Sequence, residues 1–247
     1  MSAHFITFGS AQYEPTLRRI ESQAKTSGWF STVIAYRERD ISASASKEWI
    51  FRPENRRGFG YWLWKSEFIL RRLREIPDND YLVYCDAGCT VNAKGVRRWN
   101  EYKTLISPET NKDLLCFQMR HLDIHWTKAE TIRICGVDTL DASVLHTGQI
   151  IGGILVLRNT AELRDFYEGR RRLLLENLQI IDDSPSPGGE QKGFREHRHD
   201  QSVMSLSIKS LYKTRAVLIP DETFPSGTPP DWKKLCHIPF LASRIRR

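Results

Sequence analysis

The stretch from Asp80 to Asn92 constrains the fold of this chain more than any other. It reads Asp-Tyr-Leu-Val-Tyr-Cys-Asp-Ala-Gly-Cys-Thr-Val-Asn, with an unbroken apolar and aromatic run over residues 81–85. Such a run predicts an inner strand of a parallel sheet that is covered on both faces. Because ligands bind outside the carboxyl ends of such strands, we expect Asp86 to face a crevice, with Gly88 allowing close backbone approach. Taken alone, Asp-x-Gly after a strand also fits an ordinary turn.

The patterns before this stretch predict a Rossmann-like α/β fold with a mainly parallel central sheet flanked by helices. Residues 4–9 and 32–36 read as strands on either side of a helix over residues 15–27. Phe8 and Gly9 end the first strand where the first nucleotide-contacting loop of such a sheet lies. The length of 247 residues suits one large domain or two small ones, and we expect a single domain.

The segment 56–65, Arg-Arg-Gly-Phe-Gly-Tyr-Trp-Leu-Trp-Lys, has the most unusual composition in the chain. One interpretation is a helix start whose aromatic side chains pack on the sheet. The other adds a ligand, because Arg57 and Lys65 near a helix start suit phosphate or sugar hydroxyls, and an aromatic face suits a base or a pyranose ring. Both interpretations stay open at this point.

A second marked stretch, residues 146–157, reads as one apolar strand interrupted by Gly152 and Gly153. Paired glycines inside a strand weaken it and usually indicate a bulge, a close backbone approach or the wall of a ligand site. Gln149 would then be a polar group at that wall. A long basic helix is expected over residues 160–178, with the arginines of 170–172 on a solvated face, followed by a loop over 182–193 whose Pro, Ser and Gly content is typical of a lid.

The third marked stretch, His-Arg-His-Asp-Gln-Ser at residues 197–202, precedes a helix expected over residues 203–210. So many titratable groups at a helix start indicate a functional site, with Asp200 at its centre. The alternative is that Asp200 only caps the helix. By contrast, the scattered His121, Asp123 and His125 are interpreted as a polar surface and not as a metal site.

The charge and the cysteine content narrow the range of possible partners and cellular compartments. The net charge of +7 fits an anionic ligand or surface, and a basic tail covers residues 244–247. Five cysteines without a Cys-x-x-Cys pair read as free, largely buried thiols, and no secretory signal or membrane-spanning run is visible, so we expect a cytoplasmic protein. Peripheral contact with an anionic membrane is a further expectation. Nucleic acid is not an expected partner, because the chain lacks an organised basic and aromatic stripe.

Taken together, these motifs resemble the type A nucleotide-sugar-dependent glycosyltransferases, in particular the glycogenin and galactosyltransferase-like enzymes. In those families an Asp-x-Asp strand end, a small-residue strand and an Asp-Gln pair occur in the same order. By position, Asp86 matches the first Asp, Gln149 and Gly152 match the small-residue strand, and Asp200 with Gln201 matches the sugar-contacting pair. His237 is aligned with a late His that binds metal in those families. One departure is Gly88, which replaces the second Asp.

The resemblance implies a site with three groups of residues. Residues 1–120 would form a nucleotide-binding half, and residues 121–247 an acceptor and sugar half that includes the lid. A divalent cation, Mn²⁺ or Mg²⁺, would be held by Asp86, His199 and His237, and Asp200, Gln201 and His199 would be catalytic. The expected donor-binding residues are Phe8, Gly9, Arg57, Lys65, Asp86, Ala87, Gly88, Gln149 and Gly152.

The expected function is sugar transfer from a nucleotide diphosphate sugar to a glycan or another hydroxyl acceptor, as in polysaccharide biosynthesis, with cation assistance. Basic groups such as Arg57, Lys65 and Arg198 would share the stabilisation of the diphosphate leaving group. Two alternatives stay open: an inactive module that binds sugars or nucleotide sugars, and a binder of nucleic acid or anionic membranes that uses the basic helix and tail. The sequence names neither the donor base nor the sugar nor the acceptor.

Overall fold

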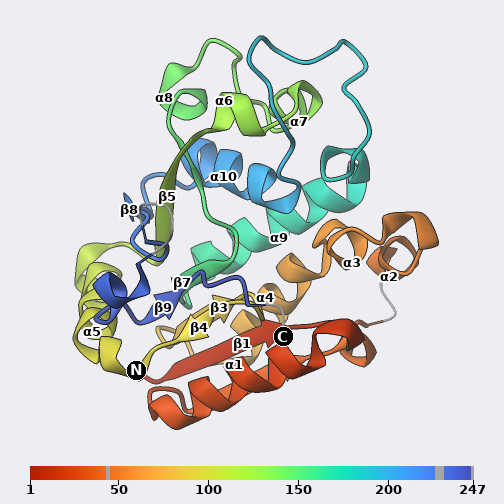
Figure 1. Ribbon diagram of the computed structural model, residues 1–247. Coiled ribbons are helices and arrows are strands. Elements are labelled where there is room, and N and C mark those ends of the chain that lie inside the picture. Colours follow the sequence, from red (N-terminus) through yellow and green to blue (C-terminus); the bar gives the residue numbers. More distant parts are fainter. Residues whose placement is uncertain (43–44, 226–230, 246–247) are drawn as a thin grey trace.

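A computed structural model describes residues 1–42, 45–225 and 231–245 (Figure 1). We also predict a Pro-rich turn over residues 224–230 from the sequence; its residues 226–230 lie outside these ranges, as do the last two basic residues, 246–247. The strands are β1 (Ala3–Phe8), β2 (Thr32–Tyr36), β3 (Tyr81–Cys85), β4 (Thr90–Val91), β5 (Leu114–Leu122), β6 (Gly148–Ile150), β7 (Ile154–Arg158), β8 (Ala216–Pro220) and β9 (Phe240–Leu241). The α-helices are α1 (Glu14–Ser27), α2 (Ala45–Ile50), α3 (Gly58–Tyr61), α4 (Trp64–Glu75), α5 (Val96–Leu105), α6 (Asp123–Trp126), α7 (Ala129–Ile134), α8 (Ala142–Leu145), α9 (Ala161–Glu176) and α10 (Asp200–Leu211).

The centre of the fold is a seven-stranded sheet in the order β2-β1-β3-β7-β5-β6, with β8 also paired to β5. Strands β1, β2, β3, β5 and β8 run in one direction, and β7 and β6 run in the other. The expected α/β fold with a mainly parallel, helix-flanked sheet is therefore confirmed, with the antiparallel β7 inserted between two parallel strands.

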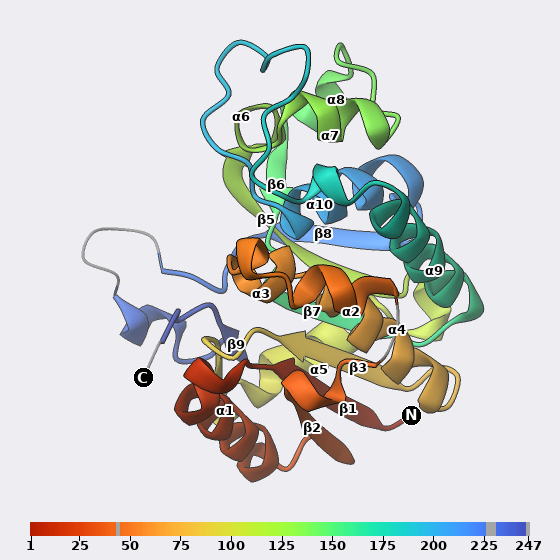
Figure 2. The same cartoon turned by 90° about the vertical axis from the view of Figure 1, so that its right-hand side faces the viewer.

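Helices cover both faces of the sheet, as Figure 2 shows from the side. Consecutive strand residues alternate between two cores: Ile6 and Leu82 pack in one, and Phe5 and Val83 in the other. The first core receives α4, α9 and α10, and the second receives α1, α5 and β9. Every residue of β3 is buried, which explains its unbroken apolar sequence.

The strand order places a crevice between the ends of β1 and β3. The chain leaves β1 through α1 to β2 on one side, whereas β3 pairs with β1 on the other side. The connections therefore diverge at the carboxyl ends of β1 and β3, where open α/β sheets bind their ligands. Phe8 ends β1 and Asp86 follows β3, so both predicted donor-site segments lie at this edge.

The aromatic segment before α4 is not the regular helix start that we expected. Gly58, Phe59, Gly60, Tyr61 and Trp62 all have positive φ, between 52° and 81°, and form a left-handed turn. Left-handed backbone costs a residue with a side chain about 1–2 kcal/mol. Regular helix begins only at Trp64. The left-handed turn places Trp62 at the wall of the crevice and packs Tyr61 in the core.

Three further expectations are wrong in detail. The glycine-marked run is two strands, β6 and β7, with Gly152 and Gly153 in the connection between them. Arg170 does not lie on a solvated face, because it is buried and donates hydrogen bonds to Ser66 Oγ and to the Asp200 carbonyl. Asp123 is not part of a polar surface, since it is fully buried and paired with Lys209 at 2.5 Å.

The left-handed turn yields a stability prediction for Gly60→Ala. A Cβ on Gly60, at φ +81°, would lie 2.6 Å from the Ile50 Cα, whereas a Cβ on Gly189, at φ +80°, would meet nothing within 4 Å. Gly60→Ala and Gly189→Ala should each lose about 1–2 kcal/mol of stability because alanine disfavours positive φ. Only Gly60→Ala should lose about 1–3 kcal/mol more, because its Cβ overpacks against Ile50. Urea unfolding should show this difference, and equal losses in the two variants would contradict it.

Outside the sheet, the loop over residues 182–193 packs along α6 and α7. Lys128 Nζ donates to the Asp182 and Ser184 carbonyls at 3.1 and 2.8 Å, and the Ala129 N–H donates to Glu190 Oε2 at 2.7 Å. None of the helices in the described ranges is long and apolar enough to cross a membrane. All five cysteines are unpaired, and Cys85, Cys89 and Cys116 are buried as predicted.

Candidate active site

Two adjoining cavities open at the carboxyl edge of the sheet. The first, of about 360 Å³, lies between the ends of β1 and β3, and the second, of about 280 Å³, lies between β3, the β6–β7 connection and the start of α10. They share Arg57, Trp62 and Asp86 as walls. The expected donor and catalytic residues that line one or both are Phe8, Gly9, Arg57, Lys65, Asp86, Ala87, Gly88, Gln149, Gly152, His199, Asp200 and Gln201.

A buried lysine stands at the centre of this arrangement. The Lys65 ammonium lies 3.0 Å from Asp200 Oδ2 and 3.6 Å from Asp86 Oδ1, and it donates to the Gly152 carbonyl at 3.1 Å. Only 3 % of its side chain is exposed, against 39 % for Asp86. Burial opposes its charge, but the carboxylates of Asp200 and Asp86 outweigh burial and raise the pKa of Lys65. Lys65 is therefore a fixed cation that joins α4, β3 and α10.

Asp86 is both a turn residue and part of a cavity wall. Its carbonyl accepts from the Cys89 N–H at 2.8 Å, and its own N–H donates to the Gly153 carbonyl at 2.8 Å. The Tyr84 hydroxyl donates to Asp86 Oδ1 at 2.5 Å. A Cβ on Gly153 would lie 2.9 Å from Asp86 Oδ2, so glycine is required for this close approach. The predicted close backbone approach at the paired glycines is thus present.

Gln201 and Gln149 fix the opposite wall of the second cavity. Gln201 Nε2 donates to Gln149 Oε1 at 2.6 Å, and Gln201 Oε1 accepts from the Gly152 N–H at 2.8 Å. Gln149 Nε2 in turn donates to the buried Asp123 Oδ1 at 3.0 Å. Asp200 does not cap α10: His199 occupies the N-cap position and the Asp200 carboxylate pairs with Lys65.

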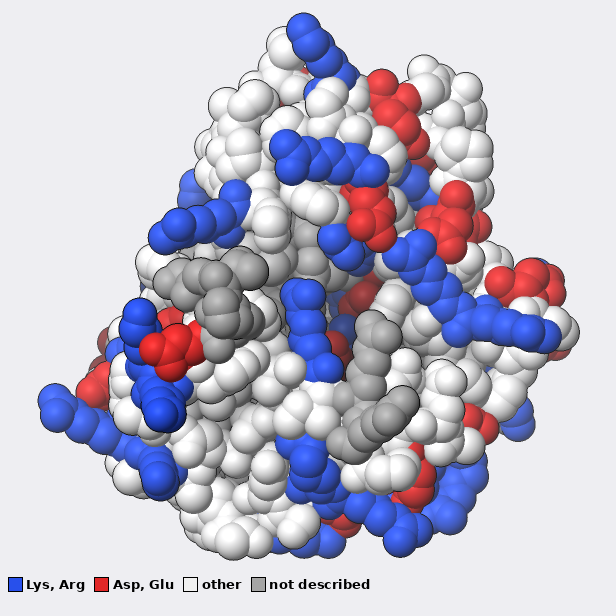
Figure 3. All heavy atoms as spheres, viewed as in Figure 1, with Lys and Arg blue, Asp and Glu red and all other residues white. Residues whose placement is uncertain are grey.

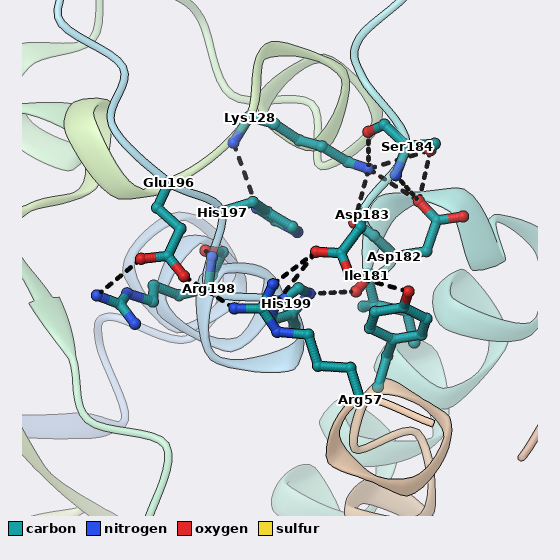
Figure 4. Close-up of polar contacts among 12 residues, drawn as sticks. Arg57, Lys128, Ile181, Asp182, Asp183, Ser184, Glu196, His197, Arg198 and His199 are labelled. Atoms are coloured by element: carbon teal, nitrogen blue, oxygen red, sulfur yellow. Dashed lines mark hydrogen bonds and ion pairs between the residues drawn. The ribbon is translucent and has the colours of Figure 1, made fainter. Parts of the chain in front are cut away.

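Arg57 joins the left-handed turn to the far side of the cavities (Figure 4). Its guanidinium donates to Asp183 Oδ1 and Glu196 Oε1, both at 2.8 Å. Asp183 also accepts from the Tyr61 hydroxyl at 3.0 Å. Arg57, predicted as a donor-binding residue, therefore lines both cavities while its charge is already engaged by two carboxylates. An anionic ligand would compete with these carboxylates for Arg57.

His197 and His199 are buried as neutral side chains. His197 Nδ1 accepts from the Lys128 N–H, so its Nε2–H donates to the Ile180 carbonyl at 2.8 Å. His199 Nδ1–H donates to the Ile181 carbonyl at 2.7 Å and the ring stacks on Trp62. Burial lowers the pKa of both histidines, and that of His197 falls well below its usual value.

These histidines predict a loss of stability in mild acid. The unfolded chain takes up a proton on each near pH 6.5, but the folded chain does so only at lower pH, so stability is fully present above that pH and falls as pH falls below it. The slope is about 1.4 kcal/mol per pH unit for each histidine. His197→Gln should flatten the decline in urea unfolding between pH 7.5 and 5, whereas His237→Gln, at an exposed side chain, should not. An unchanged slope in His197→Gln would refute this account.

The residues do not form the cation site that the resemblance implied. His199 shares the second cavity with Asp86, but His237 is exposed on the segment before β9 and lines neither cavity. In the described ranges, no group of three or more His, Cys, Asp or Glu side chains is arranged to hold a metal ion. Lys65 also lies within 3.6 Å of Asp86, and its charge opposes a second cation there. The side chains present therefore fit a divalent cation poorly.

Comparisons with known proteins identify the fold. No family model matches the sequence, and no curated protein matches it. Among solved structures, a glycosyltransferase involved in the glycosylation of the major capsid of PBCV-1 has a TM-score of 0.52 at 9 % identity, with 98 % of this chain and 92 % of that chain covered. Mouse xyloside xylosyltransferase 1 also has a TM-score of 0.52, at 10 % identity, with 98 % of this chain and 97 % of that chain covered. The chain has the glycosyltransferase fold. These matches confirm the type A fold expected from the sequence. At 9 % and 10 % identity they show the fold alone.

The structure adds cavity residues that the sequence interpretation missed. Trp62 lines both cavities, and Arg244 lines the second cavity. The glycines at 58 and 60 were a signal for the turn that presents Trp62, because glycine readily adopts positive φ. No sequence signal placed Arg244 beside Asp86, since 158 residues separate them along the chain.

Proposed function

We propose that this chain is a glycosyltransferase that transfers a sugar from a nucleotide diphosphate sugar to a hydroxyl group of a glycan or another acceptor. The observation that carries the proposal is the bridge from Asp86 through Lys65 to Asp200 at the junction of the two cavities. It joins a crevice at the β1–β3 divergence, suited to a nucleotide, to a polar cavity suited to a sugar. The confirmed fold is consistent with it.

In this proposal the first cavity takes the nucleoside and the second takes the sugar. Phe8, Tyr13 and Trp64 give the first cavity apolar and aromatic walls, and Gly9 leaves the strand end open to a ligand. Asp86, Asp200 and Gln201 give the second cavity acceptors and a donor for sugar hydroxyls. The diphosphate would lie where the two cavities meet, beside Asp86.

The reaction would break the bond from the anomeric carbon to the diphosphate oxygen and form a bond from that carbon to the acceptor oxygen, with loss of the acceptor proton. Positive charge develops on the sugar ring as the first bond breaks. In this proposal the Asp200 carboxylate stabilises that charge or orients the acceptor hydroxyl. Lys65 and Arg170 hold Asp200 in position through its carboxylate and its carbonyl, at 3.0 Å each.

The test is a panel of nucleotide diphosphate sugars, first in thermal shift and then in transfer to glycan acceptors. A donor that binds the native state raises the melting temperature, and transfer releases the nucleoside diphosphate. Stabilisation by a donor without transfer to any acceptor would favour the inactive binding module. Binding of generic DNA or anionic vesicles that weakens steeply with salt, without any response to donors, would favour the third class and would also test the predicted membrane contact.

The loop over residues 182–193 stays a predicted lid. Asp183, at the start of the loop, contacts Tyr61 and the cavity-lining Arg57, whereas Glu190 and Gln191 near its end contact α7 and α6. Donor binding should therefore slow hydrogen exchange of the backbone amides in this loop, most of all at its start. Exchange that is equally fast with and without saturating donor, over the whole loop, would contradict the prediction.

A further inference from the structure

The segment from Ala242 to Ile245 crosses the position where the second motif carboxylate is missing. The Ile245 N–H and the Ser243 hydroxyl both donate to the Gly88 carbonyl, at 2.9 and 3.0 Å. A Cβ on Gly88 would lie 3.2 Å from the Ile245 carbonyl oxygen and 3.4 Å from the Arg244 Cα. An aspartate at position 88 would therefore be tight against this segment, which would have to shift by a few tenths of an ångström, so Gly88 suits the crossing segment better than a second carboxylate does.

The same crossing brings a basic side chain to the cavities. Arg244 has a positive φ of 52°, a backbone conformation that is unfavourable for a residue with a side chain. It lines the second cavity together with Asp86, and a third cavity with Asp86, Gly153 and Gln201. Its guanidinium lies 5.5 Å from the centre of the Phe224 ring, without a carboxylate partner among the described residues. Figure 3 shows Lys and Arg side chains at the edge of a hollow on this face, with acidic side chains inside it.

We propose that Arg244 binds the diphosphate of the donor directly, in the place of the second motif carboxylate and its cation, so that donor binding needs no divalent metal ion. A carboxylate needs a bridging cation before it can hold a diphosphate, whereas a guanidinium binds phosphate oxygens itself through paired hydrogen bonds. Lys65 offsets only one of the two negative charges of Asp86 and Asp200 and is held by both carboxylates. Arg244, which has no carboxylate partner among the described residues, is therefore the cation available to the diphosphate. The inference rests on the proposed function for the identity of the ligand only.

Inorganic pyrophosphate in the presence of EDTA is the probe that isolates this site from sugar transfer. Calorimetry should show binding to the parent without metal, and Arg244→Gln should weaken it by at least about tenfold, the loss of roughly one charge-assisted hydrogen bond. Lys234→Gln is the matched control, because it removes the same charge from an exposed side chain on the neighbouring segment. Arg244 is exposed, so its variant should keep the melting temperature of the parent.

Each outcome of this experiment either supports or overturns the inference about Arg244. Binding of pyrophosphate that requires Mn²⁺, that is absent in EDTA, or that is equal in parent and Arg244→Gln overturns the inference. Sugar transfer that persists in EDTA and falls with Arg244→Gln supports it together with the proposed function. Pyrophosphate binding through Arg244 without transfer from any donor leaves the inference standing and removes the proposed function. Transfer that requires Mn²⁺ and is unchanged in Arg244→Gln overturns the inference and supports the proposed function.

Discussion

Asp200→Asn should lower turnover by about a hundredfold or more, in the range seen when a positioned acid-base group is lost, with little change in donor affinity. The physical reason is the charge of the carboxylate. Asn keeps the shape and the hydrogen-bonding oxygen of Asp200 but cannot oppose positive charge on the sugar. Steady-state kinetics with the donor found in the panel would measure the effect on kcat and KM separately. Turnover close to that of the parent would remove Asp200 from the mechanism.

This variant needs a control for stability, because Asp200 is buried and paired. Asp113 is a fully buried carboxylate that pairs with Arg215 at 2.6 Å, and it precedes β5 at the opposite edge of the sheet. Asp113→Asn should lose stability as Asp200→Asn does and yet keep its turnover per folded molecule. Equal loss of turnover in the two variants would mean that Asp200→Asn acts through folding.

Lys65→Met should lower the free energy of unfolding by about 3–5 kcal/mol, the usual cost of removing one partner from a buried ion pair. The carboxylates of Asp86 and Asp200 would then face each other across the space that the ammonium occupied, with burial and mutual repulsion both opposing their charge. Urea unfolding measures the loss. A smaller loss than about 1 kcal/mol would show that solvent enters and screens the two carboxylates.

A double-mutant cycle separates the ion pair from packing. In Lys65→Met with Asp200→Asn, one of the two uncompensated carboxylates is gone, so the combined loss of stability should be smaller than the sum of the single losses by about 1–3 kcal/mol. Additive losses would indicate that the Lys65 ammonium and the Asp200 carboxylate do not stabilise each other.

The sequence predicted those parts of the fold that depend on local composition. The apolar run at 81–85 and the strand at 32–36 have the predicted bounds, because strands carry a pattern in their own residues. The left-handed turn could be predicted only in part: Gly58 and Gly60 permit positive φ, but Phe59, Tyr61 and Trp62 disfavour it and adopt it only under tertiary constraint.

The burial of charged side chains could also not be predicted from the sequence, because each buried charge depends on a partner that is distant along the chain. Arg170 looked like a surface residue in a basic run, yet Ser66 and the Asp200 carbonyl hold it inside. Asp123 likewise needs Lys209, which is 86 positions away. Asp86, Gly152 and Asp200 could be assigned to the cavity walls from the sequence because each follows or opens a regular element, where chain direction alone brings side chains to one edge.

Many contacts that frame the cavities join a side chain to a backbone group. Lys65 donates to the Gly152 carbonyl, Gln201 accepts from the Gly152 N–H, and Arg19 donates to the Ala87 and Cys89 carbonyls. A backbone group is present whatever residue occupies the position, so mutational drift on that side of each contact leaves the contact intact. The substitutions that would break these contacts are therefore confined mainly to the few side chains that reach a backbone group and to glycines beside which a side chain has little space. The cavities of this chain can keep their frame while many of its other residues change.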